Sequence, residues 1–356
     1  MTKESFYETF FSLVRLGIGH QTIGFSIADV DWKKIRELAS RQGLLAVVVD
    51  GIDKLPVDKR PEKDLILQWI GEVINDYERR YEMYRKAILE LVGFYREHEI
   101  KMMLMKGYTC SLNWPKPNHR PCGDIDIWLF GRQEEADIIL HKEKGIKIDT
   151  RKHHHTTFYW RGFLVENHFD FLSVNLRKSN IPIEKKLKEI VHKESKECDG
   201  IILPSIEFNA IYLLRHSATH FASTEMTIRQ VLDWAFFMEK HYQEIDWNKY
   251  LPYIKQEGMF RFYNLMGLFC MRYLGFDASI FNGLYEDELF ERFSNEILTP
   301  EFKDCENGKL LWSLWVKPRR WWHNRWKNRI CYPDGAWSEF AYGLWAKILK
   351  PSHFLE

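Results

Sequence analysis

The sequence is poor in cysteine, and its cysteines lack the close pairing that structural zinc sites require. Only 6 occur in 356 residues, and there is no C-x-x-C pair. They are scattered at Cys110, Cys122, Cys198, Cys270, Cys305 and Cys331. This spacing argues against a structural zinc site and against a disulfide framework. It is typical of reduced thiols in a cytosolic protein.

Long apolar runs are missing as well. The longest, around Leu44 to Val49, is far too short to cross a bilayer. The opening residues, MTKESFYETFFSLVRLG, mix acidic with apolar side chains, whereas a signal peptide has a cationic start and an apolar core. We therefore expect no transmembrane segment and a cytoplasmic location.

The chain also lacks an excess of charge of either sign. Its 51 Lys and Arg residues balance 50 Asp and Glu residues, which leaves a formal net charge of +1. Such a chain has no overall attraction for nucleic acid, so any basic surface must be local. Hydrophobic residues make up 45% and charged residues 28%, a balance typical of globular proteins.

Two helical regions enclose a central block of a different kind. Apolar residues recur three or four positions apart through residues 1–98 and again through residues 205–300. Asp31, Ser205 and Thr224 are predicted to cap the starts of helices. The longest predicted helix carries one apolar stripe, at Leu65, Trp69, Val73, Tyr77, Tyr81, Tyr84, Ile88, Leu91 and Tyr95.

The central block, residues 99–204, shows the short apolar runs of β-strands. Strands are predicted at residues 100–105, 125–129, 146–149, 156–160, 163–171 and 200–203, with a helix at 134–141. We therefore predict an α+β fold in which a small mixed β-sheet core, 99–204, is flanked by helical domains. The helical domains are residues 1–98 and 205–300. A basic, Trp-rich segment, 301–356, follows them.

Two aspartates of the central block are spaced for joint metal binding. Asp124 and Asp126 are separated by one residue, and alternate residues of a strand point to the same face. Ile125 and Ile127 would anchor the opposite face in the core. Adjacent carboxylates repel one another, and a divalent cation relieves that repulsion. We expect Mg²⁺, with Mn²⁺ as an alternative; two solvated aspartates on an edge strand are the competing interpretation.

A third carboxylate is expected on a neighbouring strand. Glu166, His168 and Asp170 alternate along the predicted strand 163–171, which would place all three on one face. Glu166 is the preferred third acid and Asp170 the reserve. In two-metal phosphoryl transfer one cation binds the triphosphate and the other activates the attacking hydroxyl. The third acid would serve the second cation or accept the proton.

Three further sites could contact phosphate groups. The Lys106-Gly107 step falls where a strand turns into a helix, so the glycine would let the backbone approach a phosphate. The Lys106 ammonium and the Arg120 guanidinium are candidate phosphate ligands. Gly123 would allow the turn that delivers Asp124. A solvated lysine and an ordinary loop glycine remain the simpler alternatives.

These segments resemble the polymerase-β-like nucleotidyltransferase superfamily, and most closely an uncharacterised bacterial family within it. The resemblance is carried by Lys106-Gly107, Arg120-Pro121, Gly123-Asp124-Ile125-Asp126 and Glu166-Asn167-His168. Residues 32–43 are similar to the N-terminal segment of that family, and His220, Arg229 and Asp233 match a polar set in its C-terminal helices. The glycine–serine step usual in the superfamily is replaced here by Lys106-Gly107.

The resemblance implies a Mg²⁺-dependent enzyme that moves a nucleoside monophosphate from an NTP, such as ATP, to an acceptor hydroxyl. The acceptor, a small molecule, a protein or RNA, is open. The implied catalytic and metal-binding residues are Asp124, Asp126 and Glu166. The nucleotide-binding set is Lys106, Gly107, Arg120, Gly123, His168 and Arg229.

Two groups of histidines carry weaker signals. Residues 153–155 are all histidine, but consecutive residues of a regular strand point opposite ways and cannot chelate one ion. We expect a solvated loop or edge there. His216 and His220 lie four apart on a predicted helix, without the H-E-x-x-H pattern of zinc peptidases. Structural or substrate hydrogen bonds are favoured over zinc.

Two basic features also have competing interpretations. Arg229 and Asp233 have the spacing of an ion pair on one helix, and alternatively Arg229 reaches the nucleotide. Residues 317–329 interleave Lys and Arg with tryptophan, a mixture that suits RNA, an anionic surface or cation–π packing inside the protein. A catalytically weak nucleotide-binding regulatory protein, or a scaffold of the same fold, is the alternative to an enzyme.

Overall fold

The computed structural model describes residues 3–21, 30–152, 154–193, 195–223, 225–300 and 319–334. Within these ranges the chain has the predicted α+β fold, with one mixed six-stranded sheet among helices. The elements before the sheet are α1 (Lys3–Ile18), α2 (Trp32–Arg41), α3 (Leu45–Asp53), η1 (Val57–Lys59), α4 (Lys63–Glu72), η2 (Val73–Arg79) and α5 (Arg80–Glu97).

The sheet and its helices follow. These elements are β1 (Met103–Met105), α6 (Gly107–Ser111), η3 (Pro117–His119), β2 (Ile125–Trp128), α7 (Gln133–Lys144), β3 (His155–Trp160), β4 (Phe163–His168), α8 (Asn180–Ile190), β5 (Lys196–Cys198) and β6 (Ile201–Leu203). The remaining elements are α9 (Ile206–Ser223), α10 (Ile228–His241), α11 (Trp247–Gln256), α12 (Phe260–Phe269), η4 (Cys270–Leu274), η5 (Ala278–Ile280), α13 (Phe290–Leu298) and α15 (Arg325–Cys331).

The predicted helix starts are confirmed in two cases of three. The Asp31 side chain accepts a hydrogen bond from the Lys34 amide at the start of α2, and Ser205 accepts one from the Phe208 amide before α9. Thr224 lies outside the described residues. Helix α10 instead begins with a capping box in which Thr227 pairs with Gln230.

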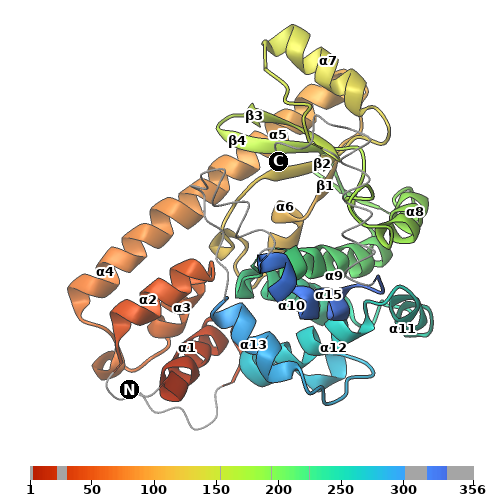
Figure 1. The fold of residues 1–356 in the computed structure, drawn as a ribbon. Helices are drawn as coiled ribbons and strands as arrows, with labels where there is room; N and C mark the ends of the chain where they lie inside the picture. Colours follow the sequence, from red (N-terminus) through yellow and green to blue (C-terminus); the bar gives the residue numbers. More distant parts are fainter. Residues whose placement is uncertain are drawn as a thin grey trace.

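The long apolar stripe forms one continuous rod. Helices α4 and α5 run on through the π-helical segment η2, from beside α2 up to the sheet (Figure 1). In the central block the predicted strand at 146–149 is wrong, because only one bridge forms there, between Asp149 and Thr157. Strand β5 was not predicted, since its three residues are polar or exposed.

The strand order of the sheet is β3-β4-β2-β1-β6-β5. Strands β2 and β4 are parallel, and β1 is antiparallel to β2. This order makes β2 an internal strand, paired on both edges, so the aspartates at its start do not lie on a sheet edge.

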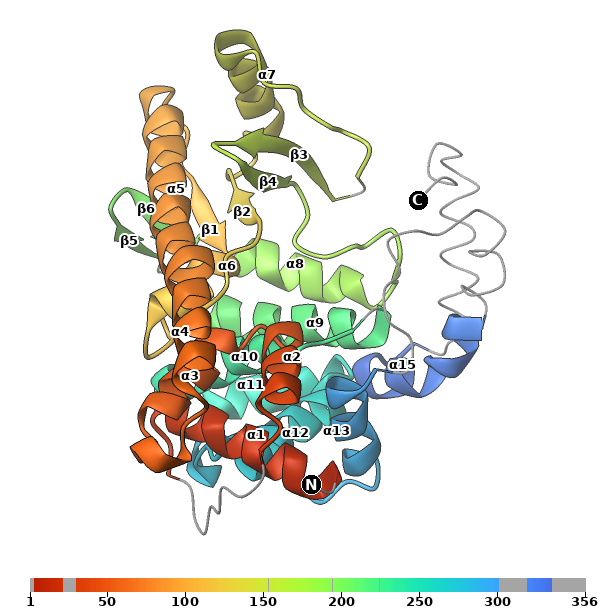
Figure 2. The same cartoon turned by 90° about the vertical axis from the view of Figure 1, so that its left-hand side faces the viewer.

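The two faces of the sheet enter different cores because side chains alternate along each strand. Leu104, Ile125 and Ile127 join a cluster with α5 and α7. Met105 and Trp128 face the other way, into a cluster with α8 and α9. Figure 2 shows α5 along one side of the sheet and α8 and α9 beneath it.

Helices from both ends of the chain share one hydrophobic cluster. It contains buried side chains of α1 and α3 together with those of α9, α10, α12 and α13. Phe11 of α1 packs on Phe269 of α12, with ring centroids 5.9 Å apart. Helix α5 belongs instead to the core of the sheet. The domain boundaries at 98 and 204 stay predictions.

The described part of the Trp-rich segment, 319–334, is partly buried. Trp326 packs beneath Arg292, and the Lys327 ammonium lies 2.6 Å from a Glu296 carboxylate oxygen. Trp322 is 54% exposed and stacks on Arg325. The cation–π packing that the sequence offered as one interpretation is therefore present for Trp326. Among the helices described, none combines the length and apolar character needed to span a membrane.

Helices α1 and α3 cross at glycines. A Cβ atom on Gly51 would lie 2.1 Å from the Leu13 carbonyl oxygen, and one on Gly17 would lie 2.0 Å from the Val47 carbonyl oxygen. No side chain fits at either place without moving a helix. The close crossing packs α1 against α3 within the shared cluster.

We predict that Gly51→Ala destabilises the protein by about 1–3 kcal/mol, because the methyl group overpacks the α1–α3 crossing. Gly93→Ala is the matched control, since a Cβ on Gly93 in α5 would meet no atom within 4 Å. The control change should stabilise by about 0.4–1 kcal/mol by restricting the unfolded chain. Urea unfolding followed by circular dichroism measures both values. Equal stability of Gly51→Ala and wild type would contradict the close crossing.

Candidate active site

Asp126 is the buried acid of the central strand β2. It is only 2% exposed, and its neighbours in the sheet are Met105 on β1 and Glu166 on β4. Because β2 and β4 are parallel and in register at this point, Asp126 and Glu166 lie side by side. Their side chains project from the face opposite Ile125. Two acids distant in the sequence are thus adjacent in the sheet.

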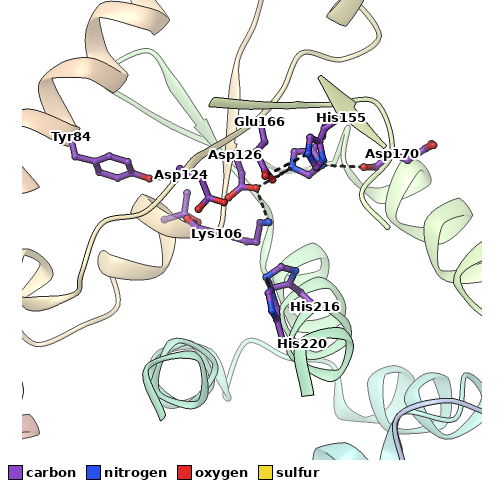
Figure 3. Close-up of polar contacts among 11 residues, drawn as sticks. Tyr84, Lys106, Asp124, Asp126, His155, Glu166, Asp170, His216 and His220 are labelled. Atoms are coloured by element: carbon purple, nitrogen blue, oxygen red, sulfur yellow. Dashed lines mark hydrogen bonds and ion pairs between the residues drawn. The ribbon is translucent and has the colours of Figure 1, made fainter. Parts of the chain in front are cut away.

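Asp124 stands one residue before β2. It is exposed and lines the same cavity as Asp126. The Tyr84 hydroxyl donates a hydrogen bond of 2.7 Å to the Asp124 carbonyl oxygen, which ties this loop to α5. Figure 3 shows Asp124 and Asp126 next to each other, with Lys106 beneath them. The two aspartates therefore share one side of the cavity.

The Lys106 ammonium lies on Asp126, with 2.6 Å between Nζ and Oδ1. Burial lowers the pKa of Lys106, but the Asp126 carboxylate and the acids near it raise that pKa well above its usual value. Lys106 and Gly107 have positive φ angles of 46° and 41° in the turn from β1 to α6. A Cβ on Gly107 would lie 2.7 Å from the Tyr84 hydroxyl, so glycine fits this turn.

Imidazoles complete the surroundings of the buried acids. His168 Nε2 lies 3.0 Å from Asp126 Oδ1 and 3.4 Å from Glu166 Oε2. Burial opposes the charge on Glu166, but the hydrogen bond from His168 and the charge of Lys106 lower the pKa of Glu166 to about 2. Burial also lowers the pKa of His168, yet its bonds to Asp126 and Glu166 raise it overall. Glu166 is consequently ionised near neutral pH.

A cavity of about 170 Å³ opens beside these acids. One side carries the aspartates with Lys106 and Gly107, and the other is formed by α9 and α10. The polar and charged residues that line it are Lys106, Arg120, Asp124, Asp126, His216, Ser217, His220, Arg229, Gln230 and Asp233. Cations and carboxylates thus meet across a single space, as a bound metal–phosphate group requires.

The Arg120 guanidinium is paired with Asp233, and Arg120 also lines the cavity. The Arg120 guanidinium donates hydrogen bonds to both Asp233 carboxylate oxygens, at 2.7 and 2.9 Å. Arg120 is 5% exposed. The Trp114 indole also donates to Asp233. The structure therefore corrects the predicted Arg229–Asp233 ion pair, because Asp233 has Arg120 as its cationic partner. This pair fixes the loop that leads to Asp124.

Arg229 is left facing the cavity. Arg229 lines the same cavity as Asp124. Among the residues described here, its guanidinium forms no ion pair. Burial and the nearby positive charge of Arg120 lower the pKa of Arg229, while Asp233 and Asp124 raise it. A half-buried cation without a carboxylate partner suits an anionic ligand.

Asp170 does not share the face of Glu166, contrary to the prediction. Strand β4 ends at His168, so the alternation stops before Asp170 is reached. The Asp170 carboxylate pairs with Lys188 of α8 instead, and Figure 3 shows it turned away from Asp126.

The two histidines of α9 face the cavity together. His220 Nε2 and His216 Nε2 are 3.1 Å apart. Burial, together with the charge of Lys106, lowers the pKa of His220 to about 4 and that of His216 well below its usual value. Both rings are therefore neutral at pH 7 and supply polar contacts without charge.

The acidic residues fit a divalent cation. Donor atoms of Asp126, Glu166 and His168 lie within 4.8 Å of one another, and Asp124 lines the adjoining cavity. Carboxylate oxygens are the ligands that Mg²⁺ prefers, and Mn²⁺ also accepts imidazole. The ammonium of Lys106 on Asp126 is independent evidence that this position requires positive charge.

Sequence reasoning missed two contributors. Tyr84 occupies an apolar helical stripe and looked like a core residue; nothing in its spacing reveals the hydrogen bond to Asp124. His155 was assigned to a solvated run, but it is 5% exposed and its Nε2 lies 3.5 Å from Glu166 Oε1. Its register opposite His168 on β4 was the signal available from the predicted hairpin.

Comparison with known proteins gives one match. The sequence model of a family described as "uncharacterised nucleotidyltransferase" covers residues 28–275, which include the sheet, α9, α10 and every cavity-lining residue named above. No curated protein and no solved structure matches significantly. The family match spans more than half of the chain and confirms the resemblance seen in the sequence. The chain belongs to this family of nucleotidyltransferases.

Proposed function

We propose that the protein transfers a nucleoside monophosphate from an NTP to an acceptor hydroxyl and releases pyrophosphate. The acceptor oxygen forms a bond to the α-phosphorus, the bond from that phosphorus to the bridging oxygen breaks, and the hydroxyl proton is lost. One observation carries the proposal: Asp126 and Glu166 are adjacent on parallel strands, with Asp124 on the same cavity. The family's general activity supports it.

Asp124, Asp126 and Glu166 would hold Mg²⁺ or Mn²⁺. When bound, such a cation neutralises triphosphate charge and favours loss of the acceptor proton. Ile125 and Ile127 anchor the strand, so the acids stay at one position relative to the cavity. The low pKa of Glu166 suits a metal ligand, which must be ionised, better than a proton acceptor. His168 orients both Asp126 and Glu166 through its Nε2 contacts.

Lys106 and Arg229 are the proposed phosphate ligands. Both line the cavity, and Arg229 has no ion-pair partner among the residues described. If another cation neutralises the Asp126 carboxylate, the Lys106 ammonium can leave Asp126 and pair with a phosphate. Gly107 and Gly123 keep the cavity wall free of side chains. Arg120, bound to Asp233, acts as a positioning residue for the Asp124 loop.

The acceptor remains the open part of this proposal. The neutral imidazoles of His216 and His220 offer hydrogen bonds to a base, a sugar or the acceptor. The exposed Trp322, which stacks on the half-buried Arg325, keeps RNA or an anionic surface as a candidate partner of residues 317–329. We keep the cytoplasm as the proposed location. Nucleotide binding without turnover is the alternative function, and the label-transfer assay below separates the two.

We predict that NTP with Mg²⁺ raises the melting temperature of wild type. The Asp124→Asn change should remove most of the increase in melting temperature that depends on Mg²⁺. Ligand at about 100 times its Kd should add ~2.7 kcal/mol of stability. Asp124 is exposed, so its replacement should leave the fold intact. Asp64→Asn, an exposed position on α4, is the matched control and should shift like wild type. Equal Mg²⁺-dependent shifts in all three proteins would remove the metal assignment, and a shift independent of Mg²⁺ favours the regulatory alternative.

We also predict that Glu166→Gln lowers nucleotidyl transfer by roughly 10²-fold or more, since the ionised carboxylate that stabilises the reacting charges is lost. NTP binding should persist. The measurement is transfer of α-³²P label from each of the four NTPs into a cell lysate.

Asp170→Asn is the matched control for this experiment, because Asp170 pairs with Lys188 away from the cavity. It should retain transfer. Loss of activity in Asp170→Asn together with full activity in Glu166→Gln would move the role to Asp170.

A further inference from the structure

Three imidazoles gather where strands β3 and β4 begin and end. His155 and His168 are directly opposite each other in the antiparallel β3–β4 pair, so their side chains lie on one face. The ring of His154 lies 4.3 Å from that of His155 and 5.5 Å from that of His168, centroid to centroid. His154 precedes the strand, so the alternation that separates consecutive strand residues does not apply to it.

The backbone holds this cluster in place. The His154 carbonyl oxygen accepts hydrogen bonds from the Phe169 and Asp170 amides, which lie just beyond β4. The loop that carries His154 is thereby fixed against the end of the strand that carries His168. The arrangement is a built feature of the sheet and not a chance approach of surface side chains.

His155 is the second, independent indication of a ligand. It is 5% exposed, and within the described part of the chain neither ring nitrogen has a hydrogen-bond partner. Burying a polar group without a partner costs free energy.

The donor atoms of the cluster lie close enough together to converge on one ion. Ligand atoms of His154, His155 and His168 lie within 4.8 Å of one another. Imidazole–zinc bonds of about 2.1 Å place tetrahedral ligands roughly 3.4 Å apart. Glu166 meets this spacing toward two of the rings, with Oε1 3.5 Å from His155 Nε2 and Oε2 3.4 Å from His168 Nε2.

We propose that His154, His155 and His168 bind a divalent transition-metal ion such as Zn²⁺, with Glu166 as the fourth ligand. Imidazole nitrogens suit zinc, whereas Mg²⁺ takes oxygen ligands. This site therefore differs in its main ligands, three imidazoles, from the oxygen site at Asp124 and Asp126, which it adjoins. It does not depend on nucleotidyl transfer, although a metal there would share Glu166 and His168 with the proposed active site.

The test is a zinc titration of the full chain without nucleotide and with Mg²⁺ in excess, followed by calorimetry. Wild type should bind Zn²⁺ despite the Mg²⁺, and His154→Ala/His155→Ala should weaken binding by roughly 10–100-fold or more. Cobalt substitution adds a spectroscopic signature, since Co²⁺ in a tetrahedral nitrogen–oxygen site gives visible absorption that the double variant should lose.

His192→Ala/His241→Ala is the control, because it removes two histidines outside the cluster and should bind Zn²⁺ like wild type. His154→Gln, a single change at a half-buried position, replaces the double variant if circular dichroism shows that the latter is unfolded; it too should bind Zn²⁺ more weakly. Unchanged affinity in the folded cluster variant, or no zinc binding by wild type, would overturn the proposal. Because no nucleotide is present, these outcomes are independent of the transfer assay.

Discussion

Compensation of the buried carboxylate of Asp126 is the constraint around which the site is organised. An ionised acid that is 2% exposed is stable only with positive charge or hydrogen-bond donors beside it. Lys106 and His168 supply both, from the turn after β1 and from β4, on either side of β2. The tight turn at Lys106 and Gly107 follows from this demand, because it delivers the ammonium to the acid. A position that requires compensating positive charge is thus built into the centre of the sheet.

The rest of the fold brings ligands to that position from distant parts of the chain. Parallel pairing of β2 and β4 places Glu166 beside Asp126. Helices α9 and α10 close the cavity with neutral histidines and with Arg229. The Arg120–Asp233 pair joins the Asp124 loop to α10. This pair fixes the side of the cavity that carries the aspartates relative to the side that carries Arg229. Removing one member of such a buried pair would leave an uncompensated charge.

Local patterns were sufficient to predict much of this arrangement. The alternation around Asp124 and Asp126 predicted which side chains face the core, and the structure confirms that for Ile125 and Ile127. Helical periodicity likewise located the rod from α4 to α5. The failures involve contacts between segments far apart. Helical spacing paired Asp233 with Arg229, but the choice of Arg120 depends on packing across 113 residues, which spacing cannot encode.

Strand ends were the other weak point. Alternation placed Asp170 beside Glu166, yet β4 stops at His168, and no local signal marked that end. The same difficulty hid the histidine cluster. The rule that consecutive strand residues point apart is correct, but His154 lies outside β3.

The central claim is that Asp124 and Asp126 hold a divalent cation that carries the triphosphate. The most direct measurement is a crystal structure with Mn²⁺ and a non-hydrolysable NTP, in which anomalous scattering locates the manganese. We expect a peak between the two aspartates and near Glu166, with Lys106 turned from Asp126 toward the phosphates. Bound NTP with no manganese at these carboxylates, and Lys106 still paired with Asp126, would contradict the account.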